Sequence, residues 1–320
     1  MEKQSKGLLT IILVCLVILL GGLGFLLCHK HGIADDSKKE LSLAVPPYEG
    51  ESYAEINGGN PFFSTKDCDA EAFEFYYELD WLGRSTGAEA CLGTELMPTE
   101  ERQSISEVKP TGWQTVTYNF VDQKSLYNRC HLIAYQLTGE NANERNLITG
   151  TRYMNVDGML PFEEEVASYI KETNNHVYYR VRPVYEGQNL VADGVVMEAY
   201  SIEDSGKGIC FNVYCYNVQP GVVIDYKDGS NQLDPDFSVE EYEKEQQDSR
   251  KEEDNQETKT LEALYDANGT DYVLNTGRKK IHRPDCRSVQ DMSPKNTYEI
   301  KAKLQELVEA GYVPCKNCRP

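Results

Sequence analysis

Positive charge is scarce in this chain. It holds 32 lysines and arginines against 52 aspartates and glutamates, and its formal net charge is −20. This balance excludes proteins that attract polyanions through bulk positive charge. Any contact with a polyanion would need local arginines or the tail from residue 271 to 320, which alone gathers ten basic residues.

Long hydrophobic runs are also scarce, and the one present is residues 8–27. About twenty uncharged residues, rising ~1.5 Å each as a helix, suffice to cross a bilayer. Lys3 and Lys6 precede the run. Positive residues on this side favour an amino terminus, residues 1–7, that stays in the cytoplasm.

Small residues are lacking at the end of this run. A cleaved signal peptide needs them at its cleavage site, whereas the run ends in Phe-Leu-Leu-Cys, and a lipoprotein needs one before Cys28, where Leu27 stands. The sequence therefore predicts an uncleaved transmembrane anchor. Residues 28–47 read as a polar tether, and the rest of the chain is expected outside the cell, on a single-pass membrane protein.

Apolar residues nearly vanish between Asp234 and Glu257, where eleven acids stand against three bases. Such a segment cannot bury enough surface to fold, so residues 229–268 are predicted to be an acidic, disordered linker.

The stretch Tyr127–Glu163 carries the chemistry. Neutral imidazole takes a proton near neutral pH. Amide and carboxylate oxygens suit a hard cation such as Mg²⁺. Arginine offers a fixed positive fork to phosphate. This inventory suits metal-assisted phosphodiester hydrolysis, and its members are His131, Asn146, Asn155 and Glu163, with Arg129 and Arg152 beside them. Taken singly, each has an ordinary reading as a core, cap, turn or first-turn residue.

The same residues resemble the DNA/RNA non-specific endonucleases of the ββα-metal, or His-Me finger, superfamily. That family's Asp-Arg-Gly-His motif aligns with residues 128–131, and the resemblance covers roughly residues 60–228. It implies that His131 is the general base and Asn155 the ligand of Mg²⁺ (or Mn²⁺). It further implies that Asn146 positions water or phosphate, that Glu163 holds metal-bound water, and that Arg129 and Arg152 face phosphate.

Two positions depart from the family motif. Asn128 replaces the aspartate and Cys130 replaces the glycine. These departures and the acidic charge motivate a second hypothesis, a catalytically weak or inactive surface protein that binds nucleic acid.

An α+β fold with an antiparallel sheet is expected. Two short apolar runs around His131 and Asn146 would pair as the strands of the finger, and helical spacing of apolar residues follows Pro161. Gly158 and Pro161 leave open whether Asn155 and Glu163 share one unbroken helix. Further strands are expected at 113–121, 177–185, 190–200, 209–218 and 222–226.

The tail carries a four-ligand pattern, His282-x3-Cys286 and Cys315-x2-Cys318, separated by twenty-eight residues. Thiolates with imidazole in a set of four favour structural Zn²⁺, and a domain with a thin core would depend on it. The tail resembles the small Cys/His module appended to some secreted bacterial nucleases; two disulfide partners and a spare histidine are the alternative. Its basic residues suggest a second nucleic-acid contact.

The other cysteines allow few pairings. Cys68–Cys91 is the one disulfide considered. Cys210 and Cys215 are expected on opposite strand faces. A Cys130–His131 nucleophile–base dyad is disfavoured because neighbouring strand residues point to opposite faces.

The sequence as a whole predicts a membrane-anchored, outward-facing endonuclease that hydrolyses DNA and RNA, with DNA-uptake machinery as a possible partner. The oligomeric state is left open. The predicted parts are a cytoplasmic terminus (1–7), a transmembrane helix (8–27), a tether (28–47), an endonuclease domain (48–228), an acidic linker (229–268) and a zinc-binding module (269–320).

Overall fold

The computed structural model describes residues 45–290, 292–315 and 318–320. The predicted cytoplasmic terminus, anchor and most of the tether lie outside these residues. Among the helices of the described part, none is both long and apolar enough to cross a membrane. The chain divides into two compact units, Met1–Pro235 and Asp236–Pro320, and each is considered by itself.

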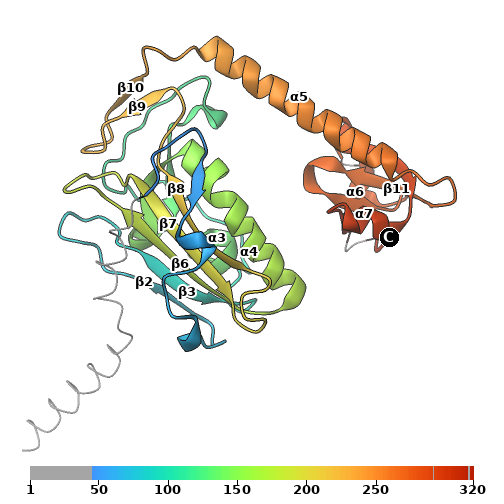
Figure 1. Ribbon diagram of the computed structural model, residues 1–320, viewed down its shortest axis with the longest axis horizontal. Helices are drawn as coiled ribbons and strands as arrows, with labels where there is room; N and C mark the ends of the chain where they lie inside the picture. The colour runs from blue at the N-terminus through green and yellow to red at the C-terminus, as the bar shows by residue number, and fades with distance from the viewer. Residues whose placement is uncertain (1–44, 291, 316–317) are drawn as a thin grey trace, which may run out of the picture. The chain divides into compact units, whose positions relative to one another are not determined.

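The first unit is built on an antiparallel sheet of six strands in the order β1-β8-β7-β6-β3-β2 (Figure 1). Its strands are β1 (Tyr53–Glu55), β2 (Phe73–Tyr76), β3 (Ala88–Leu92), β6 (Val177–Val184), β7 (Gly194–Ser201) and β8 (Cys210–Tyr216). Side chains alternate between the two faces, so Val177, Tyr179 and Val181 enter the apolar core while Arg180 and Arg182 lie on the opposite face with Glu198. The predicted antiparallel sheet is confirmed.

The finger lies against the apolar face of this sheet. Strand β4 (Tyr127–His131) pairs with β5 (Leu147–Thr151), and His131 stands opposite Leu147. The connection carries α3 (Tyr135–Thr138) and the 3-10 turn η4 (Glu144–Asn146). Cys130 and Ile148 belong to the same buried cluster as the sheet residues, so the hairpin is anchored to the core.

A continuous helical run follows β5. It passes through a π-helical turn, η5 (Met154–Met159), directly into α4 (Leu160–Thr173). Pro161 sits in the first turn of α4, where its missing N–H is tolerated, and Asn174 ends the helix in the left-handed conformation. Val166, Ala167 and Ile170 pack on the core, as the helical spacing predicted.

One predicted strand is wrong, and another forms but lies outside the main sheet. Residues 113–121 form only a single bridge, Thr117 to Ser125, because the chain reverses at η3 (Asp122–Lys124). Strand β9 (Val222–Ile224) does not join the main sheet but pairs with β10 (Asn231–Leu233). The first unit therefore reaches Pro235 rather than ending at 228. Short 3-10 turns complete it at η1 (Asn57–Gly59) and η2 (Thr65–Asp67).

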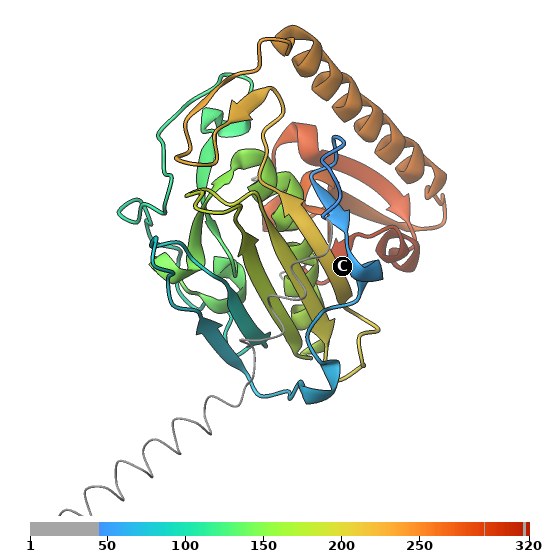
Figure 2. The same ribbon diagram turned by 60° about the vertical axis from the view of Figure 1, so that its left-hand side comes forward.

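The second unit begins with α5 (Val239–Ala263), which Figure 2 shows as one uninterrupted helix. The prediction of a disordered linker is wrong here. Ser238 caps the helix by accepting a hydrogen bond from the Glu241 N–H, and glutamate, glutamine and lysine are good helix formers. Near the helix end, Leu261 is buried in the core of this unit, so tertiary packing supports the helix.

The rest of the second unit is a four-stranded sheet in the order β13-β11-β12-β14. Its elements are β11 (Thr270–Asn275), η6 (Thr276–Arg278), β12 (Lys280–His282), α6 (Arg287–Gln290), η7 (Pro294–Asn296), β13 (Thr297–Ala302), α7 (Leu304–Glu309) and β14 (Val313–Pro314). Tyr272, Leu274 and Ile300 form a small apolar core on one face of it.

Candidate active site and metal centre

His131 ends β4 and is only 6% exposed. Its Nε2 lies 2.8 Å from the Asn141 carbonyl oxygen. A carbonyl can only accept, so Nε2 carries the proton and Nδ1 keeps its lone pair. Burial lowers the pKa of His131 to about 4, against the opposing effect of the Asn141 carbonyl and with help from the nearby Arg102 charge. The ring is therefore neutral at physiological pH, the state that a general base requires.

Arg102 is a site residue that the sequence analysis missed. Its Nη2 lies 3.4 Å from His131 Nδ1, although the two residues are 29 positions apart. Its charge also acts against the burial effect that raises the pKa of Glu163. Arg102 is an exposed loop residue preceded by two glutamates, and no motif spacing marks it. Only the fold could reveal it.

Asn146 has a different task from the one predicted. It is fully buried; its Oδ1 accepts from the Ile133 N–H at 2.9 Å and its Nδ2 donates to the Ile133 carbonyl at 3.0 Å. Both ends of the amide are thus committed to the chain two residues after His131. Asn146 therefore holds the chain just after β4 in place, and the predicted contact with water or phosphate is not seen.

Glu163 in α4 is 8% exposed. Burial, with a smaller contribution from Glu164, raises its pKa to about 8 despite the Arg102 charge. No hydrogen bond or ion pair joins its carboxylate to another described residue. A buried carboxylate without a bonded partner is costly unless it is protonated or meets a cation, so Glu163 fits a metal site.

Asn155 lies in the π-helical turn and is half-buried. Its amide makes no hydrogen bond to the described residues, while its backbone carbonyl accepts from the Leu160 N–H. The side-chain oxygen is therefore available to a ligand. Together with the carboxylate of Glu163 it supplies hard oxygen donors of the type that Mg²⁺ and Mn²⁺ prefer.

The two arginines of the motif have partners within the protein. Arg129 donates from Nη2 to the Ser106 carbonyl at 2.8 Å and stacks on Trp113, with its Cζ 4.0 Å from the ring centroid. Arg152 binds the Asp122 carboxylate through Nε at 2.9 Å and Nη2 at 2.6 Å. These contacts fix the flanking loops, and the phosphate-facing role predicted for both arginines finds no support in them.

The two residues that depart from the family motif are Cys130 and Asn128. Cys130 is fully buried in the core, and burial raises the pKa of its thiol well above the ordinary value, so the Cys130–His131 dyad is excluded. A Cβ at Gly150 would lie 2.4 Å from its Sγ, so the glycine makes room for the cysteine. Asn128 keeps a buried Nδ2 with no hydrogen-bond partner among the described residues.

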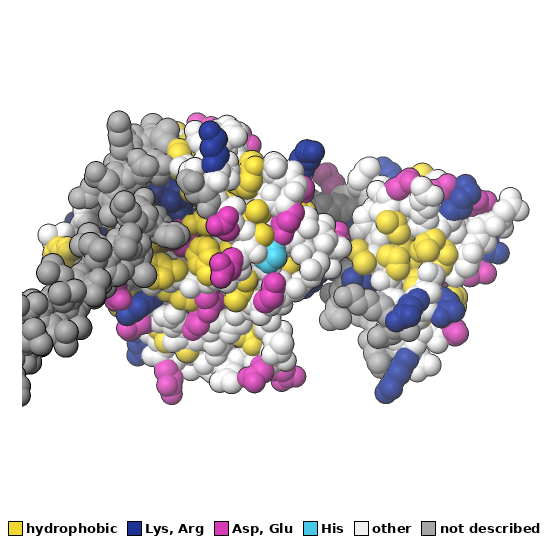
Figure 3. All heavy atoms as spheres, turned by 90° about the horizontal axis from the view of Figure 1, so that it is seen from below, with side chains coloured by type: hydrophobic (Ala, Val, Ile, Leu, Met, Phe, Trp, Pro, Cys, Tyr) yellow, Lys and Arg dark blue, Asp and Glu magenta, His cyan; other side chains and the backbone are white. Residues whose placement is uncertain are grey.

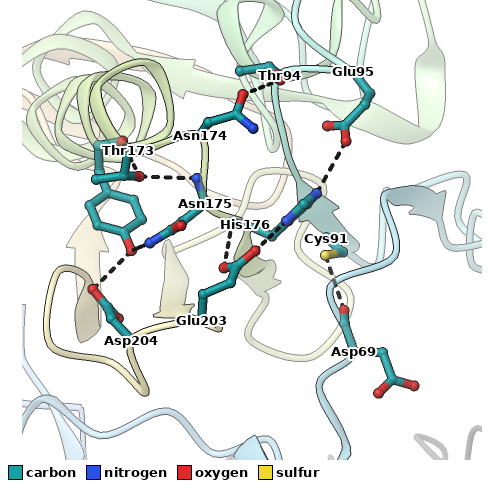
Figure 4. A network of polar contacts seen from close by, with 11 residues as sticks. Asp69, Cys91, Thr94, Glu95, Thr173, Asn174, Asn175, His176, Glu203 and Asp204 are labelled. Carbon is teal, nitrogen blue, oxygen red and sulfur yellow. Dashed lines mark hydrogen bonds and ion pairs between the residues drawn. The ribbon is translucent and has the colours of Figure 1, made fainter.

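A second histidine cluster lies at loops that end β3, α4 and β7 (Figure 4). His176 Nδ1 lies 2.6 Å from Glu203 and its Nε2 lies 3.3 Å from Glu95. The hydrogen bond to Glu203 raises the pKa of His176 despite partial burial. Both ring nitrogens are engaged, so this group ties loops together. Nearby, the Cys91 Sγ donates to the Asp69 carbonyl, and the described cysteines form no disulfide, including the one considered for Cys68.

The tail cluster is assembled as predicted. The ligand atoms of its four residues all lie within 4.8 Å of one another, and all four are buried: His282, Cys286, Cys315 and Cys318. His282 Nδ1 is buried without a hydrogen-bond partner among the described residues, and burial lowers the pKa of this ring, with help from Lys280. The Arg283 N–H points at Cys318 Sγ over 3.4 Å, as expected beside a thiolate. Three thiols and an open imidazole nitrogen fit Zn²⁺.

On the face drawn in Figure 3, acidic side chains are spread over the first unit, while the second unit shows both basic and acidic side chains. The sequence has an excess of acid before residue 258 and of base after residue 270.

Part of the first unit is similar to known nucleases. The family model described as DNA/RNA non-specific endonuclease matches residues 65–203. A deoxyribonuclease from Streptococcus dysgalactiae subsp. equisimilis is 35% identical over 109 residues, which are 32% of this chain and 32% of that protein. This chain thus spans about a third of that relative's length.

Solved structures agree. Crystal structures of NucA from Streptococcus agalactiae, one with a magnesium ion bound and one with no metal bound, are 25% identical with TM-scores of 0.54 and 0.52. They cover 62% and 63% of this chain, and the matches span 95% and 98% of theirs. The recognition made from residues 128–163 is confirmed.

Proposed function

We propose that this chain, whose residues 65–203 form a DNA/RNA non-specific endonuclease domain, hydrolyses phosphodiester bonds of DNA and RNA with a divalent metal ion. The single observation that carries the proposal is the imidazole of His131. Its Nε2–H is committed to the Asn141 carbonyl, and its neutral Nδ1 faces the cationic side chain of Arg102.

In this proposal His131 Nδ1 takes the proton from the attacking water. The bond from Nε2 to Asn141 keeps the tautomer and ring orientation and stabilises the imidazolium once it forms. Asn146 holds the chain after His131 through Ile133 and so fixes the base in place. These two contacts are made before substrate binds, so little reorganisation accompanies the reaction.

Arg102 is assigned to the scissile phosphate. In the absence of substrate its guanidinium lies against Nδ1, the atom that must receive the proton. A phosphate oxygen is a stronger partner for arginine than a neutral imidazole nitrogen, so substrate would draw the guanidinium away and free the base.

Asn155 and Glu163 would hold the divalent ion. When bound, the ion supplies charge stabilisation at the phosphate and at the leaving oxygen. Glu163 must lose its proton to serve, so metal binding and deprotonation are linked. The magnesium ion in one of the NucA structures is consistent with Mg²⁺ here.

Two further assignments complete the proposal. Zn²⁺ on the four tail ligands would hold the Cys/His unit together, and its basic surface would give a second nucleic-acid contact. Residues 8–27 would anchor the chain in the membrane with both units outside, where DNA uptake or nutrient scavenging is plausible. Protease added to intact cells would digest both units under this topology and would leave them whole if they face the cytoplasm.

The second nucleic-acid contact is tested by filter binding at low salt. The chain is compared with one truncated after Pro235, where the first compact unit ends. Weaker binding by the truncated chain supports the assignment, and equal affinity removes it.

A catalytically weak nucleic-acid-binding protein is the second candidate, motivated by the unpartnered Asn128 amide and the acidic charge. Plasmid nicking separates the two. We expect nicking by the wild type with Mg²⁺ and by His176→Ala, a control that removes a histidine from outside the site. No nicking is expected in EDTA or with His131→Ala. Intact plasmid throughout would favour the binding protein.

A further inference from the structure

Trp81 is the most exposed large apolar side chain of the described residues, with 78% of its surface open. It lies in the turn between β2 and β3. The second tryptophan of the chain, Trp113, is instead half-buried beneath the Arg129 guanidinium. A lone exposed aromatic ring needs no explanation by itself. The contacts that fix its turn, and its distance from His131, show whether it can bind a ligand.

The turn that carries Trp81 is held firmly from both sides. Asp80 Oδ1 accepts from the N–H groups of Leu82 and Arg84, both at 2.9 Å, and its Oδ2 pairs with Arg84 Nε at 2.7 Å. Gly83 supplies the positive φ of 77° that the reversal requires. The ring is thus presented on a fixed loop, which lowers the entropy lost when a ligand stacks on it.

Arg84 also fastens this turn to the segment after β6. Its Nη1 donates to the carbonyls of Gly187 at 3.0 Å and Asn189 at 2.9 Å, and its Cζ lies 4.4 Å from the Tyr185 ring centroid. Backbone contacts on three segments therefore define where Trp81 stands.

The turn is bonded to the segment that holds the general base. Ser85 Oγ donates to the Arg145 carbonyl, and Arg145 Nη2 pairs with Glu78 at 2.8 Å. Four residues earlier, the Asn141 carbonyl accepts from His131 Nε2. Four residues of chain span at most about 14 Å. Trp81 is four residues before Ser85, so two such spans joined by the Ser85 hydrogen bond place Trp81 within roughly 35 Å of the Asn141 carbonyl, the length of a short oligonucleotide.

Charge favours stacking over phosphate attraction at this place. Glu78 and Asp80 are each paired with an arginine, so the turn itself is neutral. The unit as a whole is acidic and cannot hold a polyanion by bulk attraction. Stacking of a base on an aromatic ring does not depend on net charge and accepts any base, as a nuclease without sequence preference requires.

We propose that Trp81 is a subsite where an unpaired base of a single-stranded or locally melted substrate stacks. This rests on the proposed function, because it names the strand state of the substrate of that same site. It makes single strands the better-bound substrate.

Intrinsic fluorescence tests the proposal directly, since Trp81 and Trp113 are the only tryptophans. The full-length chain carrying His131→Ala is titrated in EDTA with a thymidine oligonucleotide and with an abasic oligonucleotide of equal length. We expect quenching by the first and little by the second. Adding Trp81→Phe should abolish the quenching while leaving the affinity within about twofold, and Trp81→Leu should weaken binding about tenfold or more.

Equal quenching by the abasic strand, or unchanged affinity in Trp81→Leu, would overturn the subsite. So would quenching that depends on protein concentration without any oligonucleotide, which would assign the ring to a protein contact. In chains that retain His131, Trp81→Leu should raise KM for single-stranded DNA and leave kcat unchanged. A wild type that cuts nothing would refute the proposed function, yet the binding titration would still decide the subsite.

Discussion

Each unit of this protein buries one histidine in its candidate site, and the two are held in opposite ways. His131 has protein partners on both ring nitrogens and sits on a large apolar core shared by sheet, hairpin and helix. His282 leaves Nδ1 buried and open beside three thiols, over a small core. Protein contacts thus fix the first ring, while the second ring keeps a nitrogen open toward the three thiols, as a metal ligand would. A metal ion would therefore serve chemistry in the first unit and folding in the second.

Removing one of the four candidate zinc ligands should have the largest effect on stability. Structural Zn²⁺ contributes about 10–16 kcal/mol in small modules, far more than a thin core provides. We expect Cys318→Ser to abolish the unfolding transition of the Cys/His unit in calorimetry and to leave that of the endonuclease unit. Cys210→Ser, at an exposed cysteine of the first unit, is the control. Retention of both transitions would show that the tail folds without metal.

His131→Ala should separate chemistry from folding in the other unit. Loss of a general base lowers the rate about 10²–10⁴-fold. Because Asn146 clamps Ile133 independently of the imidazole, we expect DNA affinity and both unfolding transitions to persist. Single-turnover cleavage of a labelled oligonucleotide measures the rate. A variant that keeps most of its activity would move the base elsewhere.

Glu163→Gln should change how the stability of the first unit depends on pH. In the fold the carboxyl has a pKa of about 8, above its ordinary 4.5. Without metal the folded state therefore binds more protons than the unfolded state between these values, and stability falls as pH rises through that window. The variant should lack this loss, on the order of a few kcal/mol at pH 8.

Thermal melts in EDTA at pH 5 and pH 8 measure this effect, with Glu164→Gln as the matched neighbour. Mg²⁺ should stabilise the wild type at pH 8 and should have little effect on Glu163→Gln. Activity should rise toward pH 8, because His131 is already neutral above its pKa of about 4 and only Glu163 remains to lose a proton. Flat melting differences across pH would remove Glu163 from the metal site.

The smallest effect is expected from Ser238→Ala, which removes the N-cap of α5, the helix that begins the second unit. Loss of an N-cap costs about 0.5–2 kcal/mol. We expect a lower helical signal in far-ultraviolet circular dichroism and no change in nicking. Ser249→Ala, at an exposed position inside α5, should change little. Equal signals from both variants would mean that docking of Leu261, rather than the cap, maintains the helix.

The features that could be predicted from the sequence are those that depend on spacing along the chain. The hairpin around His131, the helix after Pro161 and the four tail ligands all depend on local periodicity or on short motifs, and the structure contains them. Cys210 and Cys215 also lie as predicted, one exposed and one buried.

What it missed depends on contacts between distant residues. Arg102 reaches His131 from an unmarked loop, Asn146 is captured by Ile133, and α5 is stabilised where Leu261 meets the tail sheet. Composition alone could not reveal that an acid-rich segment would find an apolar partner at its end.

The π-helical turn before α4 sets the relative direction of the two candidate metal ligands, Asn155 and Glu163. In a regular α-helix eight residues rotate about 80° past two full turns, which would point Asn155 and Glu163 in divergent directions. A π-helical turn accommodates one extra residue without further rotation, so eight residues act as about seven and the two side chains return to one azimuth. A one-residue deletion between them would leave seven residues in a regular helix, about 20° short of two turns, and should keep the two side chains aligned. A substitution that turned this segment into regular α-helix with all eight residues kept would instead swing the amide about 80° away from the carboxylate, so regularity itself would be the lesion.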